Sequence, residues 1–522
     1  MVMEWIFSVL FRVPDNLLRF SIFRHIGRVV VLFLSTTGFS QQFIWSEAVR
    51  NERAIEHVQA LSAGNGVLHV VEQREDQQLR WIRYGLETMQ LLSGTNISPA
   101  HSNSKLAYYF IVRDTLHTLS TRWNRDEDCT EVWALRYSKE GTPLGEPALV
   151  HKRNEPGEPR HSGLQMELSP DSTLILLFFD PDSERRQAEG LHFKCFDTDW
   201  TSVWEKDLRL PAAPEILQVH HFLMDNRGGV YMMSGRKPNK TSADWQQPQG
   251  GQYVLYHYNY ALNKLKQYDI SLKDKQVISV DFMLNQSQEL FVAGFYSDNF
   301  QNKAAGTLLF AIDSFGGSIT KAAYTPFSAE FLKEATGKSK GTLDDIYLDH
   351  IYISNEGILV LTGEQYYTSR YVSTDPTTGR QLVEYRYNFD DILVCMLDSA
   401  ARHLQTIRVA KRQMSSNAND TNYSYGFAAD EHHIYLTFND DADNNESTTT
   451  SNPREASLWA GSKSSVTTRV MLDYKGRMER RTLIDNSTER LLFNPLMLPS
   501  ESWARQYSGF DDRRSYKFCH IR

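Results

Sequence analysis

Short apolar runs separated by polar turns recur along most of this chain. Leu308–Phe327 is one example: an apolar run ends at Ile312, Asp313 and a Gly-Gly pair follow, and a second extended run begins. Asp and Asn suit such turns because their short side chains bond to their own backbone. The pattern therefore predicts a β-hairpin in this stretch.

Nearly the same hairpin returns at intervals of 54 to 85 residues. Its turn residues align as Ser138, Asp197, Asn259, Asp313, Asp398 and Asp473. Each repeat also has an earlier hairpin, and these span Leu164–Asp180, Phe222–Gly235, Phe282–Phe295, Tyr352–Glu364 and Phe427–Asn439. Each repeat therefore holds four strands, A to D. Four-stranded units that repeat in this way are typical of β-propeller blades.

The ends of the chain determine the blade count. Five complete blades cover roughly 164–485, and a sixth spans about 104–152. Strand-like runs remain at Val67–Val71 and Leu79–Leu86, and near the C-terminus at Trp503–Ile521. We expect these ends to combine into one closing blade, because closure removes exposed strand edges. The prediction is an all-β propeller of about seven four-stranded blades, with six or eight also compatible. A stack of β-sandwiches is the alternative, but no Pro/Gly/Ser-rich linker is visible.

The N-terminus has the pattern of a secretory signal. Arg19, Arg24 and Arg28 flank a short apolar run, Val29–Phe39, that ends in small residues. This run is shorter than the roughly 20 apolar residues of a membrane span. We expect residues 1–40 to be a signal peptide with an unusual N-terminal extension, cleaved after Ser40. A buried N-terminal helix is the alternative. Residues 41–522 are then a single propeller domain without a transmembrane segment, in the periplasm or at the cell surface.

Composition narrows the possible functions. The chain has 522 residues, with 64 acidic and 56 basic side chains and a net charge of −8. This balance argues against nucleic-acid binding, which requires a basic surface. The four cysteines show no CxxC pair, so their spacing does not indicate a metal site. We expect most of them to be buried and to pack as small apolar side chains. The serine-hydrolase, zinc-protease and phosphate-loop motifs are absent from the sequence. We expect no cofactor.

The blocks between about Asp197 and Asn439 resemble a family. "FDTDWTSVWEKDLRLP", "LDHIYISNEGILVLTGEQYY", "NFDDILVCMLDSAARHLQTIRVAKRQ" and "IYLTFND" are similar to a widespread family of exported Bacteroidetes proteins with propeller-like repeats. The similarity covers roughly two thirds of the chain. The resemblance implies export and supports the repeat. It assigns no activity and offers no catalytic residues.

The long connections all follow strand B or strand D of a repeat, so they are expected on one face. They are Arg236–Gly250, Pro326–Tyr347, Tyr366–Phe389, Lys411–Tyr423 and Asp440–Ser464. Loops on a rigid scaffold often carry binding residues. The candidate ligand-binding residues are Glu364, Gln365, Tyr366, Tyr367, Arg370, Lys411, Arg412 and Gln413. The alternatives are a β-ribbon extension of one blade for the Tyr-rich stretch, and a solvated loop for the Lys-Arg stretch.

One acidic stretch has the spacing of calcium ligands. Asp440, Asp441, Asp443 and Glu446 place four carboxylates at roughly alternating spacing within seven residues, and carboxylates are the ligands that calcium prefers. The Gly and the final Glu of an EF-hand loop are missing, so an acidic loop without fixed structure is the alternative.

These observations leave three hypotheses for function. The first is an exported, non-enzymatic binding or scaffolding propeller that recognises a protein or glycan of the cell envelope on its long-loop face. The second is a carbohydrate-active enzyme, a glycoside hydrolase or lyase, and it predicts carboxylates in the central channel. The third is an accessory or capping subunit of an outer-membrane complex, which rests on analogy with other exported propellers.

Overall fold

A computed structural model describes most of the chain. The described residues are 43–50, 55–74, 78–154, 164–179, 190–210, 217–236, 253–298, 303–313, 317–374, 379–398, 400–416, 421–445, 452–459, 461–497, 506–511 and 515–521. The predicted signal peptide, residues 1–40, lies outside them and stays a prediction. The chain divides into two compact units, Ile44–His520 and a second made of Met1–Phe43 with Ile521–Arg522. No helix in the described ranges is both long and apolar enough to cross a membrane.

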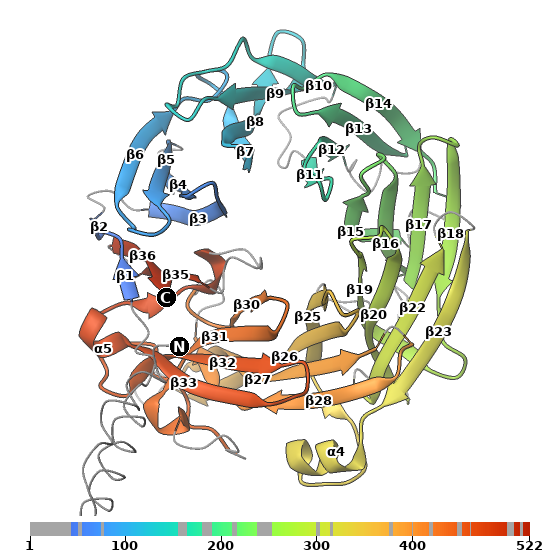
Figure 1. The fold of residues 1–522 in the computed structure, drawn as a ribbon, viewed down its shortest axis with the longest axis vertical. Coiled ribbons are helices and arrows are strands. Elements are labelled where there is room, and N and C mark those ends of the chain that lie inside the picture. The colour runs from blue at the N-terminus through green and yellow to red at the C-terminus, as the bar shows by residue number, and fades with distance from the viewer. Residues whose placement is uncertain are drawn as a thin grey trace, which may run out of the picture. The chain divides into compact units, whose positions relative to one another are not determined.

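Within Ile44–His520, antiparallel four-stranded sheets follow one another around a ring (Figure 1). The first three blades are β3 (Ile55–Gly64), β4 (Val67–Arg74), β5 (Leu79–Gly85) and β6 (Leu91–Ile97); β7 (Lys105–Val112), β8 (Thr115–Asn124), β9 (Cys129–Tyr137) and β10 (Ala148–Asn154); and β11 (Leu164–Leu168), β12 (Leu174–Phe179), β13 (Leu191–Asp197) and β14 (Ser202–Leu208). The next two are β15 (Leu217–Met224), β16 (Val230–Arg236), β17 (Tyr253–Asn259) and β18 (Lys264–Ile270); and β19 (Gln276–Leu284), β20 (Leu290–Ser297), β22 (Gly306–Asp313) and β23 (Ser318–Pro326).

The remaining blades carry the irregular elements. The sixth blade is β25 (Ile346–Ile353), β26 (Leu359–Thr374), β27 (Gln381–Leu397) and β28 (His403–Val409), with β29 (Gln413–Ser415) beside β27. The seventh is β30 (Gly426–Ala429), β31 (His433–Asp441), β32 (Ser465–Asp473) and β33 (Met478–Asp485). The eighth joins β1 (Phe43–Trp45) and β2 (Val49–Arg50) to β34 (Leu492–Phe493), β35 (Tyr507–Asp511) and β36 (Ser515–Ile521). Between the fifth and sixth blades lie α4 (Ala329–Thr336) and β24 (Leu343–Asp344), and between the seventh and eighth lies α5 (Asn486–Glu489). Connections within the fifth, seventh and eighth blades contain β21 (Lys303–Ala304), η2 (Ala442–Asn445) and η3 (Pro495–Met497), respectively.

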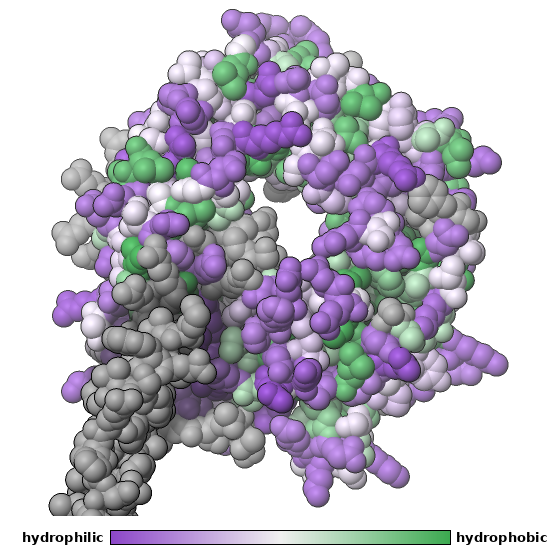
Figure 2. Space-filling view, viewed as in Figure 1, coloured by the Kyte–Doolittle hydropathy of each residue, from purple (hydrophilic) through white to green (hydrophobic). Residues whose placement is uncertain are grey.

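The apolar pattern of each strand follows its place in the blade. The central strands, such as β12 and β17, are buried on both faces and are almost continuously apolar. The outer strand β23 alternates between exposed and half-buried residues, because one of its faces meets water. In Figure 1 the A strands lie nearest the centre of the ring and the D strands outermost. The A strands therefore bring their side chains closest to the central opening that Figure 2 shows.

Apolar side chains hold neighbouring blades together. Trp81 of the first blade packs with Tyr137 of the second, and Phe178 of the third with Phe222 of the fourth. The corresponding clusters continue through the seventh blade. The seam between the seventh and eighth blades has polar contacts: Arg469 donates to the Ser508 hydroxyl at 3.4 Å.

The termini close the ring, but through strands other than those predicted. Val67–Val71 and Leu79–Leu86 do not pair with the C-terminal strands: they fall in the first blade, as β4 and β5. The C-terminal strand β36 instead pairs with N-terminal residues, Val49 opposite Tyr516, and the Ser46 amide donates to the Phe518 carbonyl at 2.9 Å. The described sheets therefore make eight blades, the upper of the predicted numbers.

The turn residues have the role that the sequence predicted. The Asp197 carboxylate accepts backbone hydrogen bonds from Asp199 and Thr201, and Asp473 accepts them from Lys475 and Arg477. These aspartates lie at turns between strands C and D. Their carboxylates are used within the turns, which explains their recurrence without any catalytic role.

Candidate functional site

The longest strands of the described chain form a ribbon on the sixth blade. β25 pairs only with Leu359–Gln365 of β26, and β28 pairs with Ile392–Leu397 of β27. β26 and β27 continue to pair with each other as far as Thr374 and Gln381. The predicted alternative for the Tyr-rich stretch, a β-ribbon extension, is therefore confirmed.

The outer half of this ribbon exposes large apolar side chains. Val372 faces Val383 and Arg370 faces Tyr385 across the ladder, so these four residues share one face. Val372, Val383 and Tyr385 are 50%, 44% and 49% exposed. We call Val372, Val383 and Tyr385 the ribbon stripe. Isolated exposed apolar residues are common, but a group on one face of a projecting element is typical of an interaction surface.

The opposite face of the ribbon is charged. The Arg386 guanidinium lies 4.2 Å from the centre of the Tyr371 ring and forms an ion pair with Glu384 at 2.9 Å. Charged side chains on a projecting strand discourage nonspecific strand pairing. The ribbon therefore presents the three apolar side chains of the ribbon stripe on one face, and an ion pair beside the exposed Tyr371 ring on the other.

A buried ionic network fixes the base of the ribbon. The Lys411 ammonium is fully buried, lies 2.6 Å from the Glu364 carboxylate and donates to the Phe389 carbonyl at 2.7 Å. The same ammonium donates to the Gln413 side chain at 3.1 Å. Glu364 also accepts from the Ser424 hydroxyl at 2.8 Å. The pair therefore links both ribbon strands to the segment that enters the seventh blade.

The other candidate residues separate into buried and exposed groups. Tyr366 packs against Phe389 within the ribbon, with ring centres 5.0 Å apart. Tyr367 donates to Asp390 at 3.0 Å. Arg370 and Arg412 are exposed. Gln365 donates to the Asp344 carbonyl at 3.1 Å. The candidates therefore divide between the buried ribbon base and exposed positions, and Lys411 is not the solvated loop residue of the alternative interpretation.

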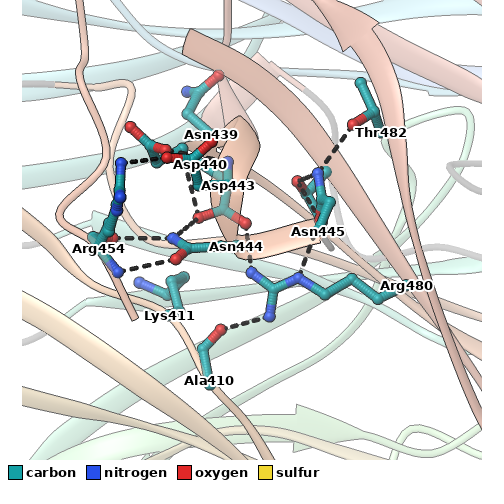
Figure 3. A network of polar contacts seen from close by, with 12 residues as sticks. Ala410, Lys411, Asn439, Asp440, Asp443, Asn444, Asn445, Arg454, Arg480 and Thr482 are labelled. Carbon is teal, nitrogen blue, oxygen red and sulfur yellow. Dashed lines mark hydrogen bonds and ion pairs between the residues drawn. The ribbon is translucent and has the colours of Figure 1, made fainter. Parts of the chain in front are cut away.

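The described part of the acidic stretch, Asn439–Asn445, belongs to the end of β31 and to η2 and not to a loop without fixed structure. Asp440 is fully buried and forms an ion pair with Arg480, and Asp443 forms an ion pair with Arg454 (Figure 3). Asp440 also accepts from the Asn444 side chain at 2.8 Å. The described residues contain no group of three or more His, Cys, Asp or Glu that could hold a metal ion.

Two of the calcium candidates therefore have arginine partners. Asp441 accepts from the backbone amide of Asp443 at 3.0 Å. Glu446 lies outside the described residues. The calcium site stays a prediction.

Titratable side chains recur on the inner strands of adjacent blades. His221, Asp281 and His350 each stand three residues before the end of their A strand, at the same register position. The His221 Nδ1 atom lies 2.6 Å from the Asp281 carboxylate. Burial alone would lower the pKa of His221, but the hydrogen bond and charge of Asp281 raise it above its usual value. Burial lowers the pKa of His350 to about 4.

Two carboxyl groups flank this row. Burial raises the pKa of Glu167 on β11 to about 7, against the opposing charge of His221. Asp349 on β25 keeps solvent-accessible surface although many protein atoms surround its carboxyl group. The desolvation by these atoms, with the charge of Glu364, raises the pKa of Asp349 to about 7, and Tyr425 donates to its carboxylate at 2.9 Å. Hydrophilic residues also occupy much of the described rim of the opening in Figure 2.

Sequence reasoning missed this row, although a signal was present. Aligning the A–B hairpins by their turns would have placed His221, Asp281 and His350 in one column. It also missed a cavity beside α4, because its lining comes from five separate stretches of the chain.

Comparison with known proteins identifies no family. No family model matches the chain, and no curated protein matches it significantly. Among solved structures, it is similar to the β-propeller domain of the Trilobed protease from Pyrococcus furiosus, with 10% identity and a TM-score of 0.37 over 83% of this chain and 97% of that one. The Dos1 propeller has 11% identity and a TM-score of 0.36, over 76% and 92%. The polysaccharide lyase Uly1 has 11% identity and a TM-score of 0.35, over 90% and 99%. Likeness at these values carries no argument about activity.

Proposed function

We propose that this chain is an exported, non-enzymatic binding or scaffolding propeller that recognises a protein or glycan of the cell envelope through the ribbon β26–β27. The observation that carries the proposal is the ribbon stripe, three large apolar side chains that are 44–50% exposed on one face of a projecting hairpin. Tyrosine and arginine are enriched among the interface residues that contribute most of the binding energy, and the face of the ribbon stripe carries Tyr385 and Arg370.

The base of the ribbon supports this role. Lys411 and Glu364 are buried, and β29 adds a further strand beside Tyr387–Phe389. A rigid base lowers the entropy that the ribbon would lose on binding. Export rests on the signal-like N-terminus, which lies outside the described residues, and on the resemblance of the Asp197–Asn439 blocks to exported proteins.

The test is capture of partners from envelope extracts by the purified chain. The ribbon variant is V372S/Y385S, and the matched control is L262S, which removes a 59% exposed leucine from a turn of the fourth blade. We expect the wild type and L262S to retain the same protein or glycan, and the ribbon variant to lose it. Equal retention by all three chains would contradict the proposal.

A second function has one specific observation in its favour. The inner strands, which lie nearest the central opening, carry three carboxyl groups, those of Glu167, Asp281 and Asp349. A carboxyl group that stays protonated near pH 7 is suited to general acid catalysis of glycoside cleavage. This enzyme hypothesis predicts turnover of a polysaccharide by the wild type and its loss in both E167Q and D349N. Turnover that survives in both variants would refute it.

A further inference from the structure

A cavity of about 450 Å³ lies beside the sixth blade. Its walls come from α4 and β24, in the connection between the fifth and sixth blades, and from the ribbon base and β28. The volume lies within the roughly 300–1,000 Å³ of small-molecule sites. The cavity is separate from the ribbon stripe and from the inner-strand row.

Apolar side chains form part of its lining. Phe331 of α4 and Ile346 of β25 are 6% and 7% exposed, and Ile392 is fully buried. Phe331 and Ile346 belong to the apolar cluster between the fifth and sixth blades, and Ile392 belongs to the next cluster, between the sixth and seventh blades. They form the apolar inner wall of the cavity, behind its charged lining.

The charges of the lining are opposite in sign to those of the whole chain. Four cationic side chains, Lys303, Lys338, Lys340 and Arg408, line the cavity together with two carboxylates, Asp344 and Asp391. The local excess is two positive charges, on a chain with a net charge of −8.

The two carboxylates already have partners. Lys303 forms an ion pair with Asp344 at 3.2 Å, and Arg408 forms one with Asp391. Lys338 and Lys340 are exposed beside them. An incoming anion would therefore meet two exposed ammonium groups without having to break either ion pair.

Local structure positions these two lysines. The Ser328 hydroxyl caps the start of α4 by accepting from Phe331 at 3.1 Å, and Gly337 ends the helix with a φ of 76°. The Thr336 hydroxyl then accepts from the Lys338 amide at 3.3 Å. A glycine suits this C-cap because a left-handed backbone is costly for other residues. The lysines therefore follow a defined turn.

We propose that this cavity binds an acidic sugar unit, whose carboxylate or phosphate contacts Lys338 and Lys340 and whose ring fills the cavity in front of its apolar wall. Ammonium groups form strong hydrogen bonds with both anions, and an aromatic face suits the CH groups of a sugar ring. The site goes beyond the ribbon, and neither proposal depends on the other.

The test is isothermal titration calorimetry of the full chain with three probes: glucuronate, glucose 6-phosphate and glucose. We expect at least one of the two anions to bind, and its affinity to fall as salt rises. Glucose should bind at least tenfold more weakly, because it lacks the charged group. The two anionic probes distinguish a carboxylate ligand from a phosphate ligand. Absence of binding by both anions, or equal binding of glucose, would overturn the proposal.

Two variants locate the site. K338Q/K340Q removes both exposed charges and should weaken anion binding about tenfold or more. A335F places a ring into the cavity from α4 and should abolish binding without changing charge. The matched control is K333Q/K264Q, which removes two exposed lysines that do not line the cavity, one of them on α4 itself. Wild-type affinity in both test variants would show that the anion binds elsewhere.

Discussion

The buried ion pair at the base of the ribbon gives a quantitative prediction. K411M replaces the ammonium with an apolar side chain of similar length. Glu364 then keeps the Ser424 hydroxyl at 2.8 Å but loses the ammonium at 2.6 Å, and the Phe389 carbonyl loses its donor at 2.7 Å. The carboxylate stays buried without a counter-charge.

The magnitude follows from that loss. Removing one partner of a buried pair costs about 3–5 kcal/mol, because the remaining charge is uncompensated. E364Q should be costly for the same reason, since it leaves Lys411 without its carboxylate. The double variant K411M/E364Q removes both charges, so its loss should be clearly smaller than the sum of the two single losses.

Urea unfolding, followed by tryptophan fluorescence and circular dichroism, measures these changes. The control is K475M, which removes an exposed lysine and should change stability by less than about 0.5 kcal/mol. Limited proteolysis of the ribbon would show whether the loss is local to its base. A K411M midpoint equal to that of K475M, or strictly additive single losses, would refute the assignment of a buried, coupled pair.

Three further predictions follow from other parts of the fold. Deleting Tyr516–Arg522 should lower the urea midpoint of the whole domain, because β36 joins the two ends of the ring; an unchanged midpoint with a monomeric product would show that this strand is not structural. Burial raises the pKa of Glu167 from 4.5 to about 7, so between these pH values the folded state keeps a proton that the unfolded state releases, and ionisation of this group lowers stability as pH rises through that window. E167Q should therefore have a higher melting temperature than the wild type at pH 8 but not at pH 4, and an equal difference at both pH values would contradict this. The four cysteines are buried and free, so a thiol reagent should label them only after unfolding, and a reductant should leave the melting temperature unchanged; rapid labelling of the folded chain would contradict their burial.

The repeat was predictable because its signals are local. Each C–D turn with an Asp in its second position bonds to its own backbone, as Asp197 and Asp473 do. The first blade was missed because its C–D turn, Gly85–Leu91, lacks that Asp and leads into an exposed strand, β6. The N-terminal strands of the closing blade have three and two residues, too few to show an apolar pattern.

The candidate site was less predictable because it depends on distant pairs. Lys411 and Glu364 form an ion pair although they lie 47 residues apart in the sequence, and Asp440 forms an ion pair with Arg480 of β33. A run of charged residues in a sequence is usually interpreted as a solvated loop, because the sequence alone does not show a distant residue of opposite charge that would pair with it when buried. The Tyr-rich stretch was predicted more accurately, because strand pairing within one hairpin is a local property.

The central claim, that the ribbon is the binding surface, is tested most directly by photo-crosslinking in the cell envelope. A benzophenone amino acid replaces Tyr385 in the ribbon stripe, or Leu262 in the control turn, both of which are exposed. We predict that irradiation joins one recurrent protein or glycan to the chain labelled at Tyr385 and not to the chain labelled at Leu262. No adduct at Tyr385, or the same adducts at both positions, would contradict the account.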